Sequence, residues 1–128
     1  MSTIERTLSD LPERIQAIVS RNIRSSDDFI AALKTELKPN ATIPVLWLVI
    51  TTGGLLLCST HRTRGLYRSF HKDAINSIRV EHSHSLPGTR IEIISSELSE
   101  PDFNVPLDTT LDTEELKTIL ETHSFRVI

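Results

Sequence analysis

Residues 45–60 read Val-Leu-Trp-Leu-Val-Ile-Thr-Thr-Gly-Gly-Leu-Leu-Leu-Cys-Ser-Thr and decide the fold. Two short apolar runs flank the central Thr51-Thr52-Gly53-Gly54. Glycine tolerates the positive φ that tight hairpin turns require, and the flanking residues favour extended backbone. The stretch therefore predicts a β-hairpin with strands Ile43–Thr51 and Leu55–Thr60.

The same region raises the question of a membrane span, because residues 39–60 carry no formal charge. A membrane helix needs about 20 continuous apolar residues. Pro44 and the pair Gly53-Gly54 interrupt this stretch, so the hairpin is preferred and no integral membrane segment is expected.

The residues after the hairpin predict four more strands and a closing helix. Gly65 and the turn Leu86-Pro87-Gly88 separate segments in which apolar and polar residues alternate. A capping box at residues 112–115, with apolar residues on both sides, starts a helix that ends near His123. The expected strands are Leu66–His71, Ile75–His82, Arg90–Ser95 and Phe103–Leu107.

The first forty residues predict a pair of helices. Apolar residues between Leu8 and Asn22 repeat at helical spacing, with Asp10 and Glu13 as a capping box. A second helix is expected from Ser25 or Ser26 to Lys38, where Pro39 ends it. We therefore divide the chain into a helical pair at 1–40 and a sheet domain at 41–128.

The first hairpin strand is apolar on both faces, because every residue from Val45 to Ile50 is hydrophobic. Successive strand residues point to opposite faces, so both faces need a cover. The C-terminal helix and the core would cover the inner face. The N-terminal helices are favoured for the outer face, and a second subunit is the alternative. The interface candidates on this strand are Leu46, Leu48 and Ile50.

Composition describes one soluble domain and excludes several classes of protein. The chain has 128 residues, one cysteine, 38% hydrophobic and 24% charged residues, and a net charge of −3. These values exclude a disulfide framework, a cysteine-rich zinc site and a generally basic nucleic-acid binder. One Trp and one Tyr leave few surfaces for base stacking. The N-terminus lacks an apolar signal stretch, so a cytoplasmic location is expected.

Three stretches are similar to the bacterial pleckstrin-homology-like domains: Trp47–Cys58, Gly65–Phe70 and Asp73–Val80. In that family a strand ends in a Thr-containing turn, the next restarts with a short apolar run, and an Ile-x-x-Ile segment follows, matched here by Ile75 and Ile78. The resemblance covers about residues 43–122. It implies an α+β fold in which a C-terminal helix closes a strongly bent antiparallel sheet or barrel, here preceded by the two N-terminal helices.

The resemblance also implies a binding scaffold rather than an enzyme. Eukaryotic relatives often bind inositol phospholipids through basic residues in the loop joining the first two strands. The first turn identified here, residues 51–54, carries no positive charge. That headgroup site is therefore not expected, and the N-terminal helices lie outside the resemblance.

A basic cluster near the third strand is the main candidate for binding an anionic ligand or a partner. The named candidates are Arg62, Arg64, Arg68, His71 and Lys72. Each basic residue near an anionic membrane contributes about 1 kcal/mol. Four would give only about millimolar affinity, so a solvated hairpin is the competing interpretation. Acidic residues between positions 97 and 115 suggest a salt-sensitive head-to-tail self-association as a further alternative.

Catalytic and metal-binding patterns are weak in this sequence. His82 and His84 supply only two close ligands, whereas catalytic zinc needs three. No nucleophile elbow or phosphate loop occurs, and Cys58 ends an apolar run. We therefore expect no catalytic residues, metal or cofactor. The preferred function is a non-catalytic module for protein–protein binding or self-association. Peripheral contact with acidic lipid comes second, and a small histidine-dependent metal protein or enzyme third.

Overall fold

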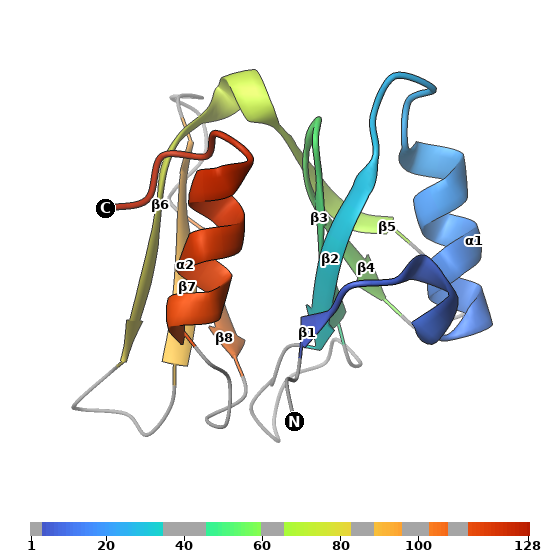
Figure 1. Cartoon of the computed structure of the whole chain (residues 1–128), viewed down its shortest axis with the longest axis horizontal. Helices are drawn as coiled ribbons and strands as arrows, with labels where there is room; N and C mark the ends of the chain where they lie inside the picture. Colours follow the sequence, from blue (N-terminus) through green and yellow to red (C-terminus); the bar gives the residue numbers. More distant parts are fainter. Residues whose placement is uncertain (1–3, 35–45, 60–65, 83–88, 96–102, 108–112) are drawn as a thin grey trace.

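The computed structural model describes residues 4–34, 46–59, 66–82, 89–95, 103–107 and 113–128. These residues form two antiparallel sheets and two α-helices (Figure 1). The five-stranded sheet has the order β1 (Ile4–Glu5), β2 (Phe29–Lys34), β3 (Leu46–Thr51), β4 (Gly54–Ser59), β5 (Leu66–His71). The three-stranded sheet comprises β6 (Ile75–His82), β7 (Thr89–Ser95) and β8 (Phe103–Leu107), and the helices are α1 (Glu13–Asn22) and α2 (Thr113–Thr122).

The predicted hairpin is present as β3 and β4, which pair with Thr51 opposite Gly54. The Thr51 hydroxyl fixes the turn, because it accepts a hydrogen bond from the Gly53 N–H and donates one to the Gly54 carbonyl, both at 3.2 Å. Gly54 has φ +151°, and a Cβ there would clash with the Phe70 carbonyl. Only glycine satisfies both conditions at this position.

The expected second N-terminal helix is wrong, since the structure has a strand at Phe29–Lys34 instead. This segment contains Ala31 and Ala32, which are fully buried on opposite faces of the sheet. A surface helix keeps a polar face, and this stretch has none until Lys34. Residues 4–34 therefore contribute two strands and one α-helix, and β2 pairs directly with β3.

The first helix also starts later than the sequence pattern predicts. Residues Leu8–Asp10 form a 3-10 turn, and α1 begins at Glu13 with Pro12 at its N-cap and no side-chain cap. The side-chain amide of Gln16 donates to the Leu11 carbonyl at 2.7 Å. This bond holds the start of the helix in place of the expected capping box of Asp10 and Glu13.

One helix, α1, covers the outer face of the five-stranded sheet. Buried residues of α1 pack against outward-facing residues of β2, β3 and β4, with Val49 fully buried and Trp47 partly buried. The helical cover predicted from the apolar strand is thus present, with α1 in place of a helical pair. Among the described residues, no β5 residue belongs to this cluster.

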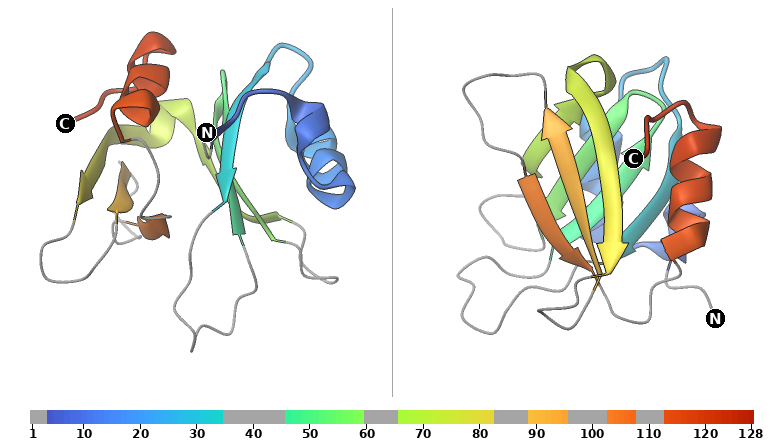
Figure 2. Two further views of the ribbon diagram at one scale, coloured as in Figure 1. Left: turned by 60° about the horizontal axis from the view of Figure 1, so that its bottom comes forward. Right: turned by 90° about the vertical axis from the view of Figure 1, so that its left-hand side faces the viewer.

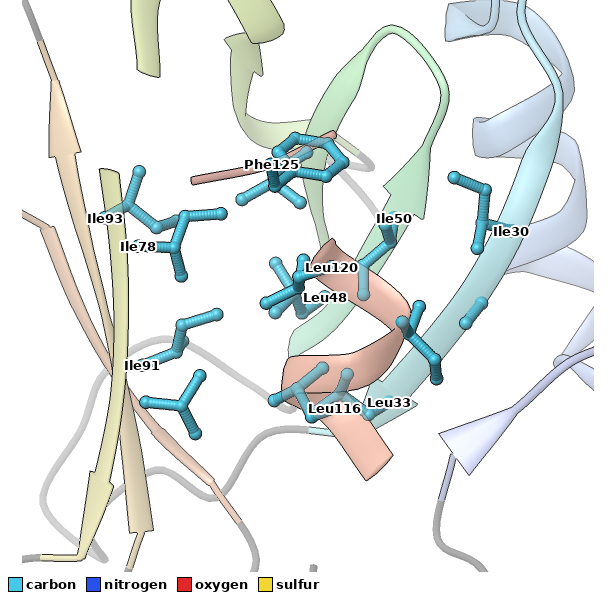
Figure 3. Close-up of a cluster of buried hydrophobic side chains, with 14 of the residues drawn as sticks. Ile30, Leu33, Leu48, Ile50, Ile78, Ile91, Ile93, Leu116, Leu120 and Phe125 are labelled. Atoms are coloured by element: carbon cyan, nitrogen blue, oxygen red, sulfur yellow. The ribbon is translucent and has the colours of Figure 1, made fainter. Parts of the chain in front are cut away.

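The main core lies between the two sheets and against α2. Figure 3 shows side chains from the three-stranded sheet, including Ile78 and Ile91, facing Leu48 and Ile50 of the other sheet. Leu116 and Leu120 of α2 fill the space between them. In the right-hand view of Figure 2 the three-stranded sheet lies in front of the five-stranded sheet, with α2 along one side of the pair.

The expected barrel is not closed in the described part of the chain, where two separate sheets are hydrogen-bonded internally. The chain passes from one to the other through a short 3-10 turn, Lys72–Ala74, between β5 and β6. That turn redirects the backbone, so β5 and β6 do not pair. In the described residues, no helix has the length and hydropathy needed to cross a bilayer.

The end of α2 seals the edge of β6. Ser124, at φ 68°, ends the helix, and its N–H donates to the Glu121 carbonyl while the Phe125 N–H donates to the Leu120 carbonyl. This is a Schellman ending with a serine where glycine is usual. The residues after Phe125 then pair with Ile78 of β6: the Ile78 N–H donates to the Arg126 carbonyl, and the Ile78 carbonyl accepts from the Ile128 N–H.

Candidate functional site

The predicted basic cluster divides in the structure. Arg62 and Arg64 lie outside the described residues, and of Arg68 only the backbone, in β5, is described. The Lys72 ammonium donates to the His123 carbonyl at 2.8 Å and lies 5.3 Å from the centre of the Phe125 ring. Lys72 therefore holds the end of α2 and is not available as a free cation.

His71 remains at the surface, at the end of β5. Its Nδ1 accepts a hydrogen bond from the Asp73 N–H at 3.2 Å and lies 3.6 Å from the Asp73 carboxylate. His71 and Lys72 are adjacent in sequence but have different surroundings: the His71 side chain is exposed to solvent, whereas the Lys72 side chain contacts the end of α2.

The proposed interface residues Leu48 and Ile50 are fully buried in the core between the sheets. Leu48 and Ile50 face this core, whereas Trp47 and Val49 face α1, so these four residues do not form an exposed apolar surface. The side chain of Leu46 lies outside the described residues. Burial within the chain explains the apolar strand without a second subunit.

The histidine and cysteine residues show no assembled reactive site in the described ranges. His82 ends β6, and His84 falls outside the description. No group of three potential metal ligands was found among the residues described. Cys58 is fully buried, and burial raises the pKa of its thiol to about 12. At neutral pH the thiol is therefore protonated and poorly suited to nucleophilic attack.

A hollow of about 230 Å³ opens on the outer face of the sheet, beyond the end of α1. Its walls come from the end of α1, the segment that follows it, the β3–β4 turn and the last residues of β5. The polar lining residues are Asn22, Arg24, Asp27, Thr51, Ser69 and His71.

Backbone hydrogen bonds fix the walls of this hollow. The Asp28 N–H donates to the Thr52 hydroxyl at 2.8 Å, and the Thr52 N–H donates back to the Asp28 carbonyl at 3.0 Å. On the other side of the turn, the Lys72 N–H donates to the Gly53 carbonyl at 2.9 Å. The segment after α1 and the end of β5 are therefore both tied to one rigid hairpin turn.

Asp27 lies over this turn because Gly53 has no side chain. A Cβ at Gly53 would clash with the Asp27 carboxylate. Asp27 is partly buried, and in the described structure its carboxylate has no hydrogen bond or ion pair, even though Arg24 lines the same hollow. Among the described residues, no cation contacts this carboxylate directly, and Arg24 is the basic residue in the lining.

The edge of β5 that faces away from β4 borders the hollow. Gly53 and Lys72 form a hydrogen-bonded position, and bonded and non-bonded positions alternate along an antiparallel pair. Ser69 and His71 fall on non-bonded positions, so their backbone N–H and C=O groups point away from β4. No other strand in the described residues pairs with this edge; we call it the open β5 edge.

Sequence reasoning identified His71 but not the surface it belongs to. The sequence pattern predicts a helix from Ser25 or Ser26 that would include Asp27 in its first turn, and it predicts only a turn at Thr51–Gly54. With β1 and β2 placed before β3, that turn is no longer the first one, so its lack of positive charge does not bear on the lipid site implied by the resemblance. The Gly-Gly pair was the signal of close approach, because one of these glycines accommodates Asp27.

Comparison with known proteins identifies the fold. No protein-family model matches the chain, and no curated protein matches it. Among solved structures, it is similar to a DUF1696 family protein with a pleckstrin-homology domain from Shewanella loihica PV-4. The TM-score is 0.62 at 11% identity, covering 98% of this chain and 100% of the other.

A second similar structure is a pleckstrin homology domain from Shewanella amazonensis SB2B. It has a TM-score of 0.54 at 18% identity, covering 84% of this chain and 94% of that one. The chain therefore has the fold of bacterial pleckstrin-homology-like domains, as the sequence resemblance predicted.

Proposed function

We propose that this chain is a non-catalytic interaction module that binds an extended segment of a partner protein along the open β5 edge. The observation that carries the proposal is the pair of outward-facing backbone positions, Ser69 and His71, beside a preformed hollow. The fold, which the chain shares with other pleckstrin-homology-like domains, fits a binding scaffold.

The chemistry of the edge indicates the kind of partner. Ser69 offers a backbone donor and acceptor and His71 offers a second donor two residues along the same strand, while the His71 carbonyl belongs to the N-cap of the following 3-10 turn. An extended polypeptide matches this arrangement, because it repeats its own donors and acceptors with the same period. Main-chain hydrogen bonds would supply affinity, and the adjacent hollow would receive one side chain of the bound segment.

Binding to acidic lipid has less support from the described residues. Of the basic cluster, Lys72 is held by the end of α2, and the side chains of the three arginines are not described. Flotation of the protein with neutral and anionic vesicles at low and high salt tests this alternative. Salt-sensitive binding to anionic vesicles alone would favour lipid attachment over the protein partner.

The proposal is tested by selecting random dodecapeptides, displayed on phage, against the full chain. Selected peptides are synthesised, and their affinity is measured by fluorescence polarisation for the wild type, Ser69→Pro and Ser69→Ala. Proline removes the outward-facing N–H of Ser69, whereas alanine retains it. We expect at least about a tenfold loss of affinity for the proline variant and little change for alanine, since strand addition depends on main-chain bonds.

A second measurement does not alter the protein. N-methylation of alternate backbone amides in a selected peptide should abolish binding in one register and spare it in the other. Equal affinity for both serine variants, together with tolerance of every N-methylation, would overturn the proposal. Light scattering on the unbound chain shows whether a second copy occupies the edge: a mass that falls on Ser69→Pro would make self-association the occupant.

A further inference from the structure

We infer that the hollow beside the open β5 edge receives a lysine or arginine side chain of the bound segment, with the Asp27 carboxylate as its counter-charge. This inference rests on the proposed function and specifies the partner as a basic extended peptide. It is carried by the position and surroundings of Asp27.

Of the two charged residues Asp27 and Arg24 that line the hollow, Asp27 is the less exposed. Its carboxylate is partly buried and unpaired in the described structure, and it lies against the Gly53 backbone. A charge near low-dielectric protein interacts more strongly with an opposite charge than one surrounded by water does. An ammonium or guanidinium group entering the hollow would therefore gain a hydrogen-bonded counter-ion.

The other charges around the hollow determine whether it favours a cation or an anion. The C-terminal end of α1 borders it, and this end of the helix dipole carries partial negative charge. Asp28 follows Asp27 directly. On the positive side, Arg24 lies on the rim and is exposed, as is Arg21 in the last turn of α1, so water screens both more effectively.

The dimensions favour a long side chain. A strand added to β5 would lie about 4.8 Å beyond it, and its side chains would alternate between the two sheet faces. Side chains on the outer face would share that face with Ser69 and His71. To reach Asp27 they must extend across β5, and the long side chains of lysine and arginine extend further than those of aspartate or serine. A volume of about 230 Å³ accommodates one such side chain but lies below the range of drug-sized ligand sites.

The test uses the peptides selected on the wild-type chain. We expect lysine or arginine to be enriched at one register position. Replacing that lysine by norleucine should lower affinity about fivefold for the wild type and leave affinity for Asp27→Asn nearly unchanged, as for a partly screened ion pair. Asp10→Asn, at an exposed position in the turn before α1, is the control with the same change in net charge.

Gly53→Ala provides a second variant without a change in charge. A Cβ at Gly53 displaces the Asp27 carboxylate, so affinity for the lysine peptide should fall while affinity for the norleucine peptide stays the same. Peptides that lose affinity for Ser69→Pro but are indifferent to Asp27→Asn would overturn this inference and leave the proposed function standing. Binding that is indifferent to both variants would overturn both.

Discussion

The strands β5 and β6, which flank the connection between the two sheets, differ in whether their outer edges are hydrogen-bonded to other parts of the chain. The edge of β6 is occupied by the chain itself, because the N–H and the carbonyl of Ile78 are hydrogen-bonded to Arg126 and Ile128. The edge of β5 has outward-facing backbone groups at Ser69 and His71 with no paired strand among the described residues. The edge of β6 is therefore covered by several contacts, whereas no described residue covers the edge of β5.

An accessible strand edge carries a risk of unwanted pairing, and proteins usually cover or charge such edges. This chain uses Phe125, Lys72 and a helix ending to cover β6, while beside β5 it builds a rigid turn and a hollow. The contrast indicates that this fold can cover a strand edge, and that no described residue pairs with the outer edge of β5. The following predictions test how the two edges differ.

The largest expected effect is the loss of the Phe125 side chain, which packs in the core and anchors the residues that seal β6. Phe125→Ala should lower the free energy of unfolding by about 3–5 kcal/mol. Denaturant unfolding measures this loss, and hydrogen exchange should show faster exchange of the Ile78 and Ile128 amides. Arg126→Ala, which removes an exposed side chain only, is the control and should leave both values near those of the wild type.

Lys72 distinguishes a structural role from a binding role. Lys72→Met removes the hydrogen bond to the His123 carbonyl and the contact with the Phe125 ring, so stability should fall by about 1–2 kcal/mol. Lys117→Met breaks only a surface pair with Glu114, 3.7 Å apart, and should cost less than about 0.5 kcal/mol. Equal losses for the two variants would contradict the role assigned to Lys72, as would weakened peptide binding in a stable Lys72→Met variant.

Ser124 offers a gain in stability at the same edge. Its backbone lies in the left-handed region, which costs a non-glycine residue about 1–2 kcal/mol. Ser124→Gly should therefore raise the free energy of unfolding by about 1 kcal/mol, measured by thermal and denaturant unfolding. Ser124→Ala retains the strain and should give no gain, so an equal rise in both variants would refute the explanation.

The smallest expected effect on stability lies at the open β5 edge. Ser69→Ala should change the free energy of unfolding by less than about 0.5 kcal/mol, since Ser69 is exposed. Hydrogen exchange followed by NMR should show rapid exchange of the Ser69 and His71 amides and slow exchange of the Phe70 amide, which faces β4. Slow exchange at all three positions would mean that the edge is already paired.

Local patterns predicted most of the strands but not their partners. The turn at Gly53-Gly54 and the alternation in Ile75–His82 depend on neighbouring residues, so β6 has the predicted bounds, and β3 and β4 lie where the hairpin strands Ile43–Thr51 and Leu55–Thr60 were predicted. Residues 43–45 and 60 of that prediction lie outside the described residues. The prediction of a helix at Phe29–Lys34 was wrong because the apolar residues there fit the spacing of a helix as well as that of a strand buried on both faces. Only pairing with β3 decides between the two, and that contact is remote in sequence.

The candidate site was harder to predict for the same reason. Its residues come from α1, the segment after it, a turn and β5, which are separated by up to some fifty positions in the chain. No spacing rule connects Asp27 with His71. Residue types alone favoured Arg62, Arg64 and Arg68 as the binding site. The structure describes only part of the segment that contains them.

The burial of Cys58 gives the molecule an internal reporter. The thiol lies beneath α1, and its raised pKa keeps it protonated far above neutral pH. Alkylating reagents react with thiolate, so modification at pH 8 requires α1 to detach and expose the sulfur. The rate of Cys58 alkylation therefore measures how often α1 lifts from the sheet, and a change in that rate on peptide binding would show that the hollow communicates with the helix that forms its wall.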